Sequence, residues 1–168
     1  MSLAYTSTVD TAIGPFTAVV NGDGAVLASG WTADPGQLLV LVHRSIRPDD
    51  VRTTDDLGAV TKAVLAYHDG DLSVVDGVPV VQHGGEFLRQ AWDVLRDVPP
   101  GAPISYTEYA AKCGRPAAVR AAAMACARNA AALFVPCHRV LRSDGHLGGF
   151  RWGLPVKRWL LDHEAAAR

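Results

Sequence analysis

The chain has 168 residues, 49% of them hydrophobic, which suffices for one good core or for one small and one medium core. Four basic residues and ten aspartates give residues 1–83 a net charge of −6, while twelve basic and seven acidic residues give residues 84–168 a net charge of +5. No apolar run approaches the roughly 20 residues of a membrane span and no secretory signal opens the chain, so we expect a cytoplasmic protein with reduced cysteines.

The first third of the chain is predicted to form a small antiparallel sheet. Three short runs, residues 4–9, 16–20 and 25–28, are prone to form strands. Glycine, proline and asparagine separate them, as is typical of turns.

A helix and a domain boundary are predicted next. Residues 57–68 carry apolar side chains at helical spacing. The turn-prone residues 78–85 then predict a boundary, with an N-terminal α/β supporting domain over residues 1–83 and a mostly helical domain over residues 84–168. The second domain opens with an apolar stripe at helical spacing between residues 87 and 95.

Two further helices form a helix-turn-helix pattern. Ser105 and Glu108 have the spacing of a capping box, which predicts a helix from Tyr106 to Cys113. After a glycine turn, Pro116 is expected in the first turn of a second helix that runs to about residue 128. This second helix is rich in alanine, which indicates either tight helix packing or close approach to a partner.

The sequence Val-Pro-Cys-His-Arg-Val at residues 135–140 is typical of a reactive cysteine. A free thiol has a pKa of roughly 8.5, and a nearby base or cation increases its thiolate fraction. His138 is the candidate base, directly or through a bridging water, and Arg139 is a candidate cation. Alternatively, a single cysteine after an apolar run is an inert core residue.

Metal and disulfide chemistry are not expected. Cys113, Cys126 and Cys137 are an odd number of cysteines without CxxC spacing. We therefore predict no metal and no cofactor.

Residues 105–164 resemble the active-site domain of the O6-alkylguanine-DNA alkyltransferases, also called methylated-DNA:protein-cysteine methyltransferases. The similarity extends upstream through Phe87, Trp92 and Pro100-Gly101 and covers about half of the chain. It implies an α+β fold: a small N-terminal antiparallel-sheet domain with helices, and a mostly helical C-terminal domain that binds DNA and carries the active-site loop.

The resemblance also implies a function. The O6-alkyl group of guanine, chiefly methyl, would pass from duplex DNA to Cys137 in a single turnover, after minor-groove binding and rotation of the base out of the stack. The positive charge of the second half agrees with a DNA partner, although such an excess is also common on a solvated surface. We expect no membrane partner and a monomer, with several copies able to bind along DNA.

The family pattern assigns roles to individual residues. For catalysis it implies Cys137 as nucleophile, His138 held by Glu164, Tyr106 as proton donor to the base, and Asn129 as a brace around Val140. Without the resemblance, Asn129 would be interpreted as a helix C-cap and Glu164 as a solvated residue at a helix end. For DNA binding, the family pattern implies that Arg120 fills the space of the rotated nucleotide. The full set of DNA-binding residues that it implies is Arg120, Ala118, Ala121, Arg115, Ser105 and Arg128.

The substrate pocket departs from the family pattern. Its implied residues are Val140, Phe150, Arg151, Trp152 and Cys126. Phe150 often is Tyr in relatives and Trp152 often Gly, so a bulkier wall is expected, with good activity on methyl and poor activity on benzyl.

Two functions of other classes are alternatives. A DNA-binding alkylguanine sensor of the same fold would lack the nucleophile Cys137. A cysteine hydrolase would use Cys, His and Glu, but it would need an oxyanion hole and would turn over. A transcriptional role, which larger relatives perform with an additional domain, is not expected for a chain of 168 residues.

Overall fold

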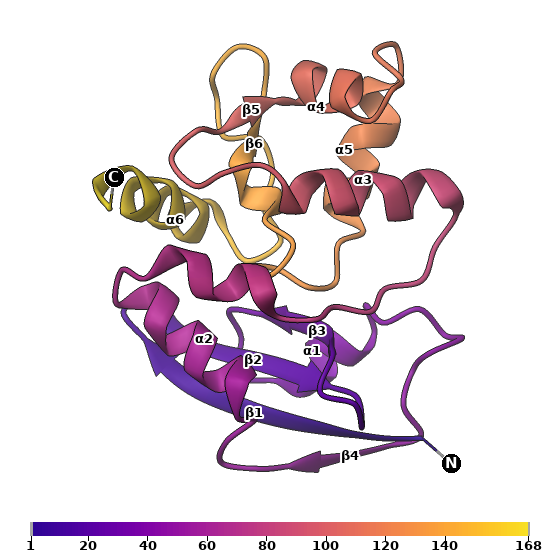
Figure 1. Cartoon of the computed structure of the whole chain (residues 1–168), viewed down its shortest axis with the longest axis vertical. Coiled ribbons are helices and arrows are strands. Elements are labelled where there is room, and N and C mark those ends of the chain that lie inside the picture. The colour runs from indigo at the N-terminus through magenta and orange to yellow at the C-terminus, as the bar shows by residue number, and fades with distance from the viewer. Residues whose placement is uncertain (1, 168) are drawn as a thin grey trace. The chain divides into compact units, whose positions relative to one another are not determined.

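The computed structural model describes residues 2–167, which divide into two compact units (Figure 1). The first unit contains the residues up to His83 together with the segment Ala130–Phe134. The second contains Gly84–Asn129 and the residues from Val135 onward. The division at residues 83 and 84 agrees with the predicted boundary, but the segment Ala130–Phe134 also belongs to the first unit.

The first unit is built on a four-stranded sheet of order β3-β2-β1-β4. Its strands are β1 (Leu3–Thr11), β2 (Gly14–Val20), β3 (Val26–Gly30) and β4 (Asp50–Thr53). The pairs β1–β2 and β2–β3 are antiparallel, as predicted, and β4 adds a parallel edge strand that the sequence did not reveal. Every residue of β3 is buried, so this strand is covered on both faces.

Helices complete the first unit. They are α1 (Pro35–Leu39), α2 (Ala59–His68) and the 3₁₀ helix η1 (Leu72–Gly77). The helix α2 matches the one predicted over residues 57–68, and it lies across one face of the sheet (Figure 1). It buries Val60, Val64 and Tyr67, which have the spacing of one helical face.

The second unit is mostly helical, and the α+β fold class is thereby confirmed. Its helices are α3 (Glu86–Arg96), α4 (Tyr106–Lys112), α5 (Val119–Ala127), the 3₁₀ helix η2 (Cys137–Arg139) and α6 (Leu154–Ala166). Two short strands, β5 (Ile104–Ser105) and β6 (Val140–Leu141), pair in parallel. This pairing places the end of η2 beside the start of α4.

The helix-turn-helix is formed by α4 and α5. The capping box is present, because Ser105 Oγ accepts from Glu108 N at 3.0 Å and Glu108 Oε1 accepts from Ser105 N at 3.1 Å. The prediction for Pro116 was wrong: Ala118 N donates to the Arg115 carbonyl, so Pro116 lies in a turn before α5 begins at Val119.

Two buried hydrogen bonds fix the helix-turn-helix against α3. Trp92 Nε1 donates to the Ala125 carbonyl at 2.9 Å, and the Tyr109 hydroxyl donates to the Ala91 carbonyl at 2.7 Å. None of the helices between residues 2 and 167 combines the length and the apolar character that a bilayer crossing needs.

Candidate active site

Cys137 lies at the start of η2, directly after Pro136, which ends the preceding extended segment. Its thiol is free and the residue is partly buried. Cys137 N donates to the Val135 carbonyl at 2.8 Å, so a tight turn presents the thiol.

Asn129 braces this turn from the end of α5. Its side-chain Nδ2 donates to the Val135 carbonyl at 2.8 Å, and its side chain also hydrogen-bonds the Cys137 thiol. This bond holds the turn at Val135, and the brace around Val140 stays a prediction. The C-cap position of α5 belongs to Arg128, so the C-cap interpretation of Asn129 is wrong.

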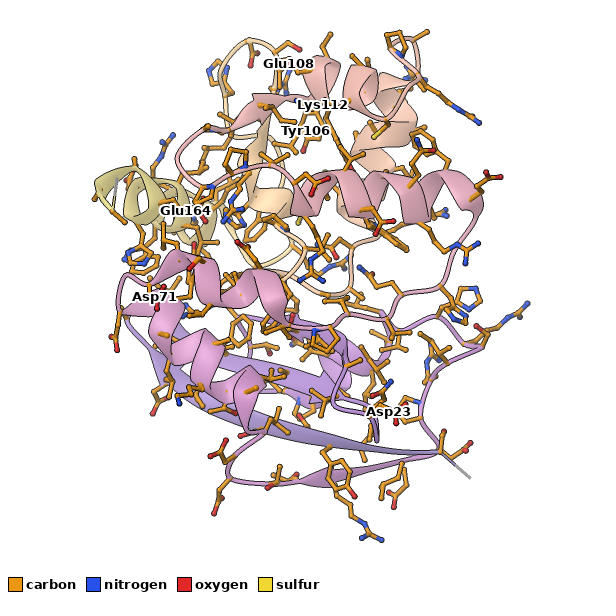
Figure 2. The ribbon with its side chains drawn as sticks, in the orientation of Figure 1. Asp23, Asp71, Tyr106, Glu108, Lys112 and Glu164 are labelled. Carbon is orange, nitrogen blue, oxygen red and sulfur yellow. The ribbon has the colours of Figure 1, made fainter. Side chains whose placement is uncertain are left out.

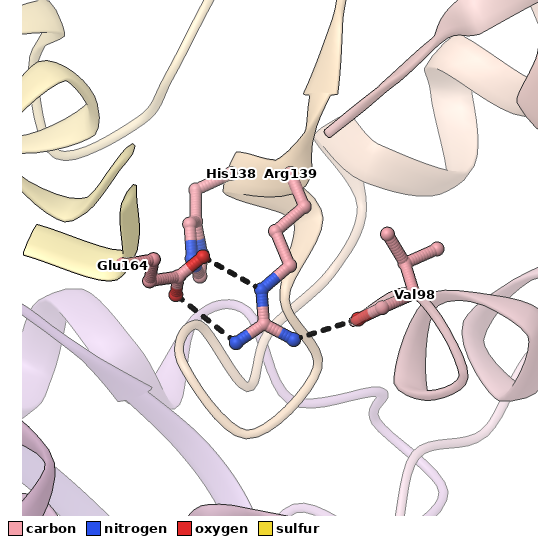
Figure 3. Close-up of polar contacts among 4 residues, drawn as sticks. All are labelled: Val98, His138, Arg139 and Glu164. Atoms are coloured by element: carbon pink, nitrogen blue, oxygen red, sulfur yellow. Dashed lines mark hydrogen bonds and ion pairs between the residues drawn. The ribbon is translucent and has the colours of Figure 1, made fainter. Parts of the chain in front are cut away.

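Glu164 joins the site from α6, where Figure 2 labels it. Its side chain is fully buried rather than solvated. Glu164 Oε2 accepts from His138 Nε2 at 2.7 Å, and the two carboxylate oxygens accept from Arg139 Nε at 2.9 Å and Nη2 at 3.0 Å (Figure 3). Arg139 Nη1 donates to the Val98 carbonyl at 2.7 Å, which ties the group to the end of α3.

This network determines which nitrogen of His138 is free to accept a proton. The ionised carboxylate has no hydrogen to donate, so Nε2 carries the proton and Nδ1 has the free lone pair. Nδ1 is buried and has no hydrogen-bond partner among residues 2–167. An acceptor nitrogen therefore lies in the residue that follows Cys137.

The pKa values in the network keep Glu164 charged and His138 neutral at pH 7. Burial alone would raise the pKa of Glu164, but the contacts with His138 and Arg139 outweigh burial and hold it well below its usual range. Burial lowers the pKa of His138, and the neighbouring Glu164 offsets only part of this effect.

The Cys137 thiol is protonated in the resting protein. Burial raises its pKa, while the hydrogen bond from Asn129 and the charges of Lys157 and Arg151 lower it to a smaller extent. Neighbouring positive charge thus acts in the expected direction, but burial outweighs it. Arg139 does not act as the cation beside the thiol because Glu164 binds its guanidinium.

Lys157 holds the backbone around the site and was missed by the sequence reasoning. Lys157 is 1% exposed, and its ammonium donates to the carbonyls of Val140 at 2.9 Å and Leu147 at 2.5 Å. A signal was available, because Lys157, Leu160 and Glu164 follow one another at helical spacing on the buried face of α6.

Tyr106 is the first residue of α4 (Figure 2). Burial, with the nearby thiols of Cys126 and Cys137, raises its pKa to about 12. The phenol therefore stays protonated at neutral pH. Gly148 lies against the ring, since a Cβ there would be 3.4 Å from Tyr106 Cε2.

The other predicted pocket residues lie on three segments: β6, the loop before α6, and α5. Val140 is buried in β6, with its carbonyl bound by Lys157. Phe150 and Trp152 are half-buried, and the Arg151 guanidinium donates to the Ala127 carbonyl at 2.6 Å. Cys126, on α5, is coupled electrostatically to Cys137, and burial raises its pKa.

The predicted DNA-binding residues are mostly exposed. Arg120, Ala121 and Arg128 are exposed and Ala118 is half-buried, whereas Ala122 and Ala125 of the same helix are fully buried. The alanines of α5 therefore serve packing on one face and leave a small-residue face uncovered. Two predicted residues have other contacts: the Ser105 hydroxyl caps α4, and the Arg115 guanidinium lies 5.3 Å from the centre of the Phe87 ring.

Comparison with known proteins identifies the family. Residues 86–166 match the model of the 6-O-methylguanine DNA methyltransferase DNA-binding domain. A methylated-DNA–protein-cysteine methyltransferase of Shigella flexneri is 31% identical over 159 residues, which are 93% of this chain and 92% of that protein. This chain belongs to the methylated-DNA–protein-cysteine methyltransferases. A Mycobacterium bovis member of this family is 36% identical over 160 residues, which cover 94% of this chain and 90% of that protein.

Solved structures of the methyltransferase family share the fold. A crystal structure of the Mycobacterium tuberculosis O6-methylguanine methyltransferase has a TM-score of 0.80 and 27% identity, and the match covers 98% of this chain and 94% of that one. The same M. tuberculosis protein in complex with DNA also gives a TM-score of 0.80. The chain spans only 25% of the Escherichia coli bifunctional transcriptional activator/DNA repair enzyme Ada, with 48% identity over 88 residues.

Proposed function

We propose that this protein repairs alkylated DNA by direct reversal: it transfers the O6-alkyl group of guanine, chiefly methyl, to Cys137. The observation that carries this proposal is the buried group of His138, Arg139 and Glu164 directly beside a partly buried free cysteine. The group orients a neutral imidazole with its acceptor nitrogen Nδ1 unused by the protein. This arrangement activates a thiol that is protonated at rest.

The transfer is an in-line displacement at the alkyl carbon. His138 Nδ1 takes the thiol proton through a bridging water, as Glu164 stabilises the imidazolium that forms. The sulfur–carbon bond then forms while the carbon–O6 bond breaks, and its electron pair stays with guanine. Tyr106, protonated because its pKa is about 12, donates a proton to the guanine N3 and regains one by way of His138. Restored guanine and S-alkylcysteine are the products, without a cofactor.

DNA engagement is assigned to α5. Its exposed small face around Ala118 and Ala121 admits close approach to the minor groove. Arg120, exposed on the same helix, fills the space of the rotated nucleotide. Arg128, at the C-cap of α5, and Arg115, in the turn before this helix, contribute positive charge. Rotation of the base is required because sulfur cannot reach an O6 substituent in line within a stacked duplex.

The pocket favours small alkyl groups. Phe150 and Trp152 are half-buried in the loop that precedes α6, and the backbone at Gly148 lies against the Tyr106 ring. The carbonyls of Cys137 and Val140 and the Arg151 N–H are assigned to the guanine edge. We assign good transfer to methyl and poor transfer to benzyl.

The surroundings of the protein follow from this chemistry. Its partner is double-stranded DNA that carries O6-alkylguanine, bound by a monomer, with several copies able to bind along one duplex. We place it in the cytoplasm, where the thiol stays reduced.

Stoichiometry tests the proposal against a hydrolase. A thioether at Cys137 is stable, so each molecule reacts once. In the presence of excess duplex with one O6-methylguanine, restored guanine should reach a plateau of one per protein molecule. Continued turnover would establish a hydrolase, and preferential binding without repair would establish a non-catalytic sensor.

A further inference from the structure

The segment Ala130–Phe134 forms a closed loop next to the nucleophile. It connects Asn129 to Val135, and these two flanking residues are joined by the 2.8 Å hydrogen bond from Asn129 Nδ2 to the Val135 carbonyl. Cys137 follows two residues after Val135. The conformation of the loop therefore determines where the Asn129 amide and the Cys137 thiol lie.

Residues of the first unit hold the backbone of this loop. Ser29, fully buried in β3, donates from its N–H to the Ala130 carbonyl at 2.9 Å and from its hydroxyl to the Ala132 carbonyl at 2.7 Å. Gln82 Oε1 accepts from Ala130 N at 2.9 Å. Three polar groups of the loop backbone thus find their partners in the N-terminal half of the chain.

The loop contains a strained residue that needs such support. Leu133 has a φ of +79°, and no other non-glycine residue between 2 and 167 has a positive φ. A leucine rarely adopts this conformation, which persists only where the surroundings determine it. The Leu133 side chain is 1% exposed, and the next residue, Phe134, packs edge-on against Phe16 of β2 at 6.4 Å between ring centres.

We propose that Ser29, assisted by Gln82, is a positioning residue for the alkyl transfer, an inference that rests on the proposed function of Cys137. By fixing the loop Ala130–Phe134, Ser29 holds Asn129 in its contact with the thiol. The N-terminal unit then contributes to the reaction rate through the loop as well as to stability.

A matched pair of variants tests this role. Ser29→Ala removes the hydroxyl bond to the Ala132 carbonyl and keeps the backbone bond to Ala130. Thr6→Val removes a comparable buried bond elsewhere in the same sheet, from Thr6 Oγ1 in β1 to the Ala18 carbonyl at 2.9 Å. Two properties are measured under conditions where both variants are folded: the methyl-transfer rate constant at saturating DNA, with the DNA affinity, and the pH dependence of Cys137 alkylation by iodoacetamide, followed by peptide mapping.

Ser29→Ala should lower the transfer rate constant about tenfold or more while the DNA affinity stays within about twofold. The midpoint of the iodoacetamide profile should move to higher pH, because a displaced Asn129 no longer stabilises the thiolate. Thr6→Val should leave both readouts unchanged, and Ser29→Thr, which keeps the hydroxyl, should restore them.

Equal behaviour of Ser29→Ala and Thr6→Val in both readouts would overturn the proposal. If Ser29→Ala does not fold, Gln82→Met replaces it, because Gln82 is half-buried and also bonds the loop. This variant should likewise lower the transfer rate constant and move the iodoacetamide midpoint to higher pH. The iodoacetamide readout does not depend on DNA. If the unaltered protein did not transfer methyl, the proposed function would be refuted. The iodoacetamide profile would still show whether Ser29 positions Asn129 beside the thiol.

Discussion

Replacing Glu164 by glutamine removes one charge from the centre of the buried network. The carboxylate is fully buried and accepts from three donor atoms, His138 Nε2, Arg139 Nε and Arg139 Nη2, at 2.7 to 3.0 Å. An amide has one acceptor oxygen, so its NH₂ must face one of these donors. The Arg139 guanidinium then stays buried without a counter-charge.

Two effects of Glu164→Gln can be given a magnitude. An unpaired buried charge costs about 3–5 kcal/mol of unfolding free energy. If His138 changes its tautomer to accept from the new amide, the proton moves to Nδ1 and the general base is lost, which costs about 10²- to 10⁴-fold in rate. Because domains have about 5–15 kcal/mol of stability, most of the variant should remain folded at 25 °C.

The measurements are denaturant unfolding and the single-turnover rate of methyl transfer, corrected for the folded fraction. Asp162→Asn is the matched control, because the same chemical change occurs two residues earlier on α6. Its carboxylate is 69% exposed and lies 3.8 Å from Arg158 Nη1, so its loss should change stability by less than about 0.5 kcal/mol. A Glu164→Gln protein as stable and as fast as this control would refute the reasoning.

Two further outcomes are expected from the same site. Since burial lowers the pKa of His138, the transfer rate should stay level as pH falls to about 6.5 and should decline only below that pH. A decline centred above about pH 7 would contradict a neutral imidazole in the resting protein. Folding stability should weaken over the same range below pH 6.5, because the unfolded chain then binds the proton more readily than the folded one. Lys157→Met should slow transfer at saturating DNA about tenfold or more, because the carbonyls of Val140 and Leu147 lose their common donor. Arg158→Met, at the exposed neighbouring position, should leave the transfer rate unchanged. Equal transfer rates of the two variants would show that Lys157 does not position this backbone.

Local patterns and family resemblance predicted the features that depend on short spacing. The capping box of Ser105 and Glu108 is local, so the start of α4 could be predicted to the residue. The α+β fold and the family are confirmed by the relatives and by the solved structures. The structure brings His138 and Glu164 into contact across 26 residues, a pairing that only the resemblance implied.

Features that depend on distant contacts could not be predicted. The parallel strand β4 has only four residues, none of them fully buried, and pairing with β1 alone makes it a strand. The sequence could not show that Glu164, 25 residues away, binds the Arg139 guanidinium, or that the Asn129 side chain bonds the Val135 carbonyl. The thiol pKa depends on burial, which a local charge count does not contain.

The most direct test of alkyl transfer is intact-protein mass spectrometry after incubation with a duplex that carries one O6-methylguanine, combined with peptide mapping. The structure predicts a gain of one methyl group per chain, located on Cys137, and no gain in a Cys137→Ala variant. A methyl group on Cys113 or Cys126, or no change of mass while the damaged duplex is repaired, would contradict Cys137 as the acceptor.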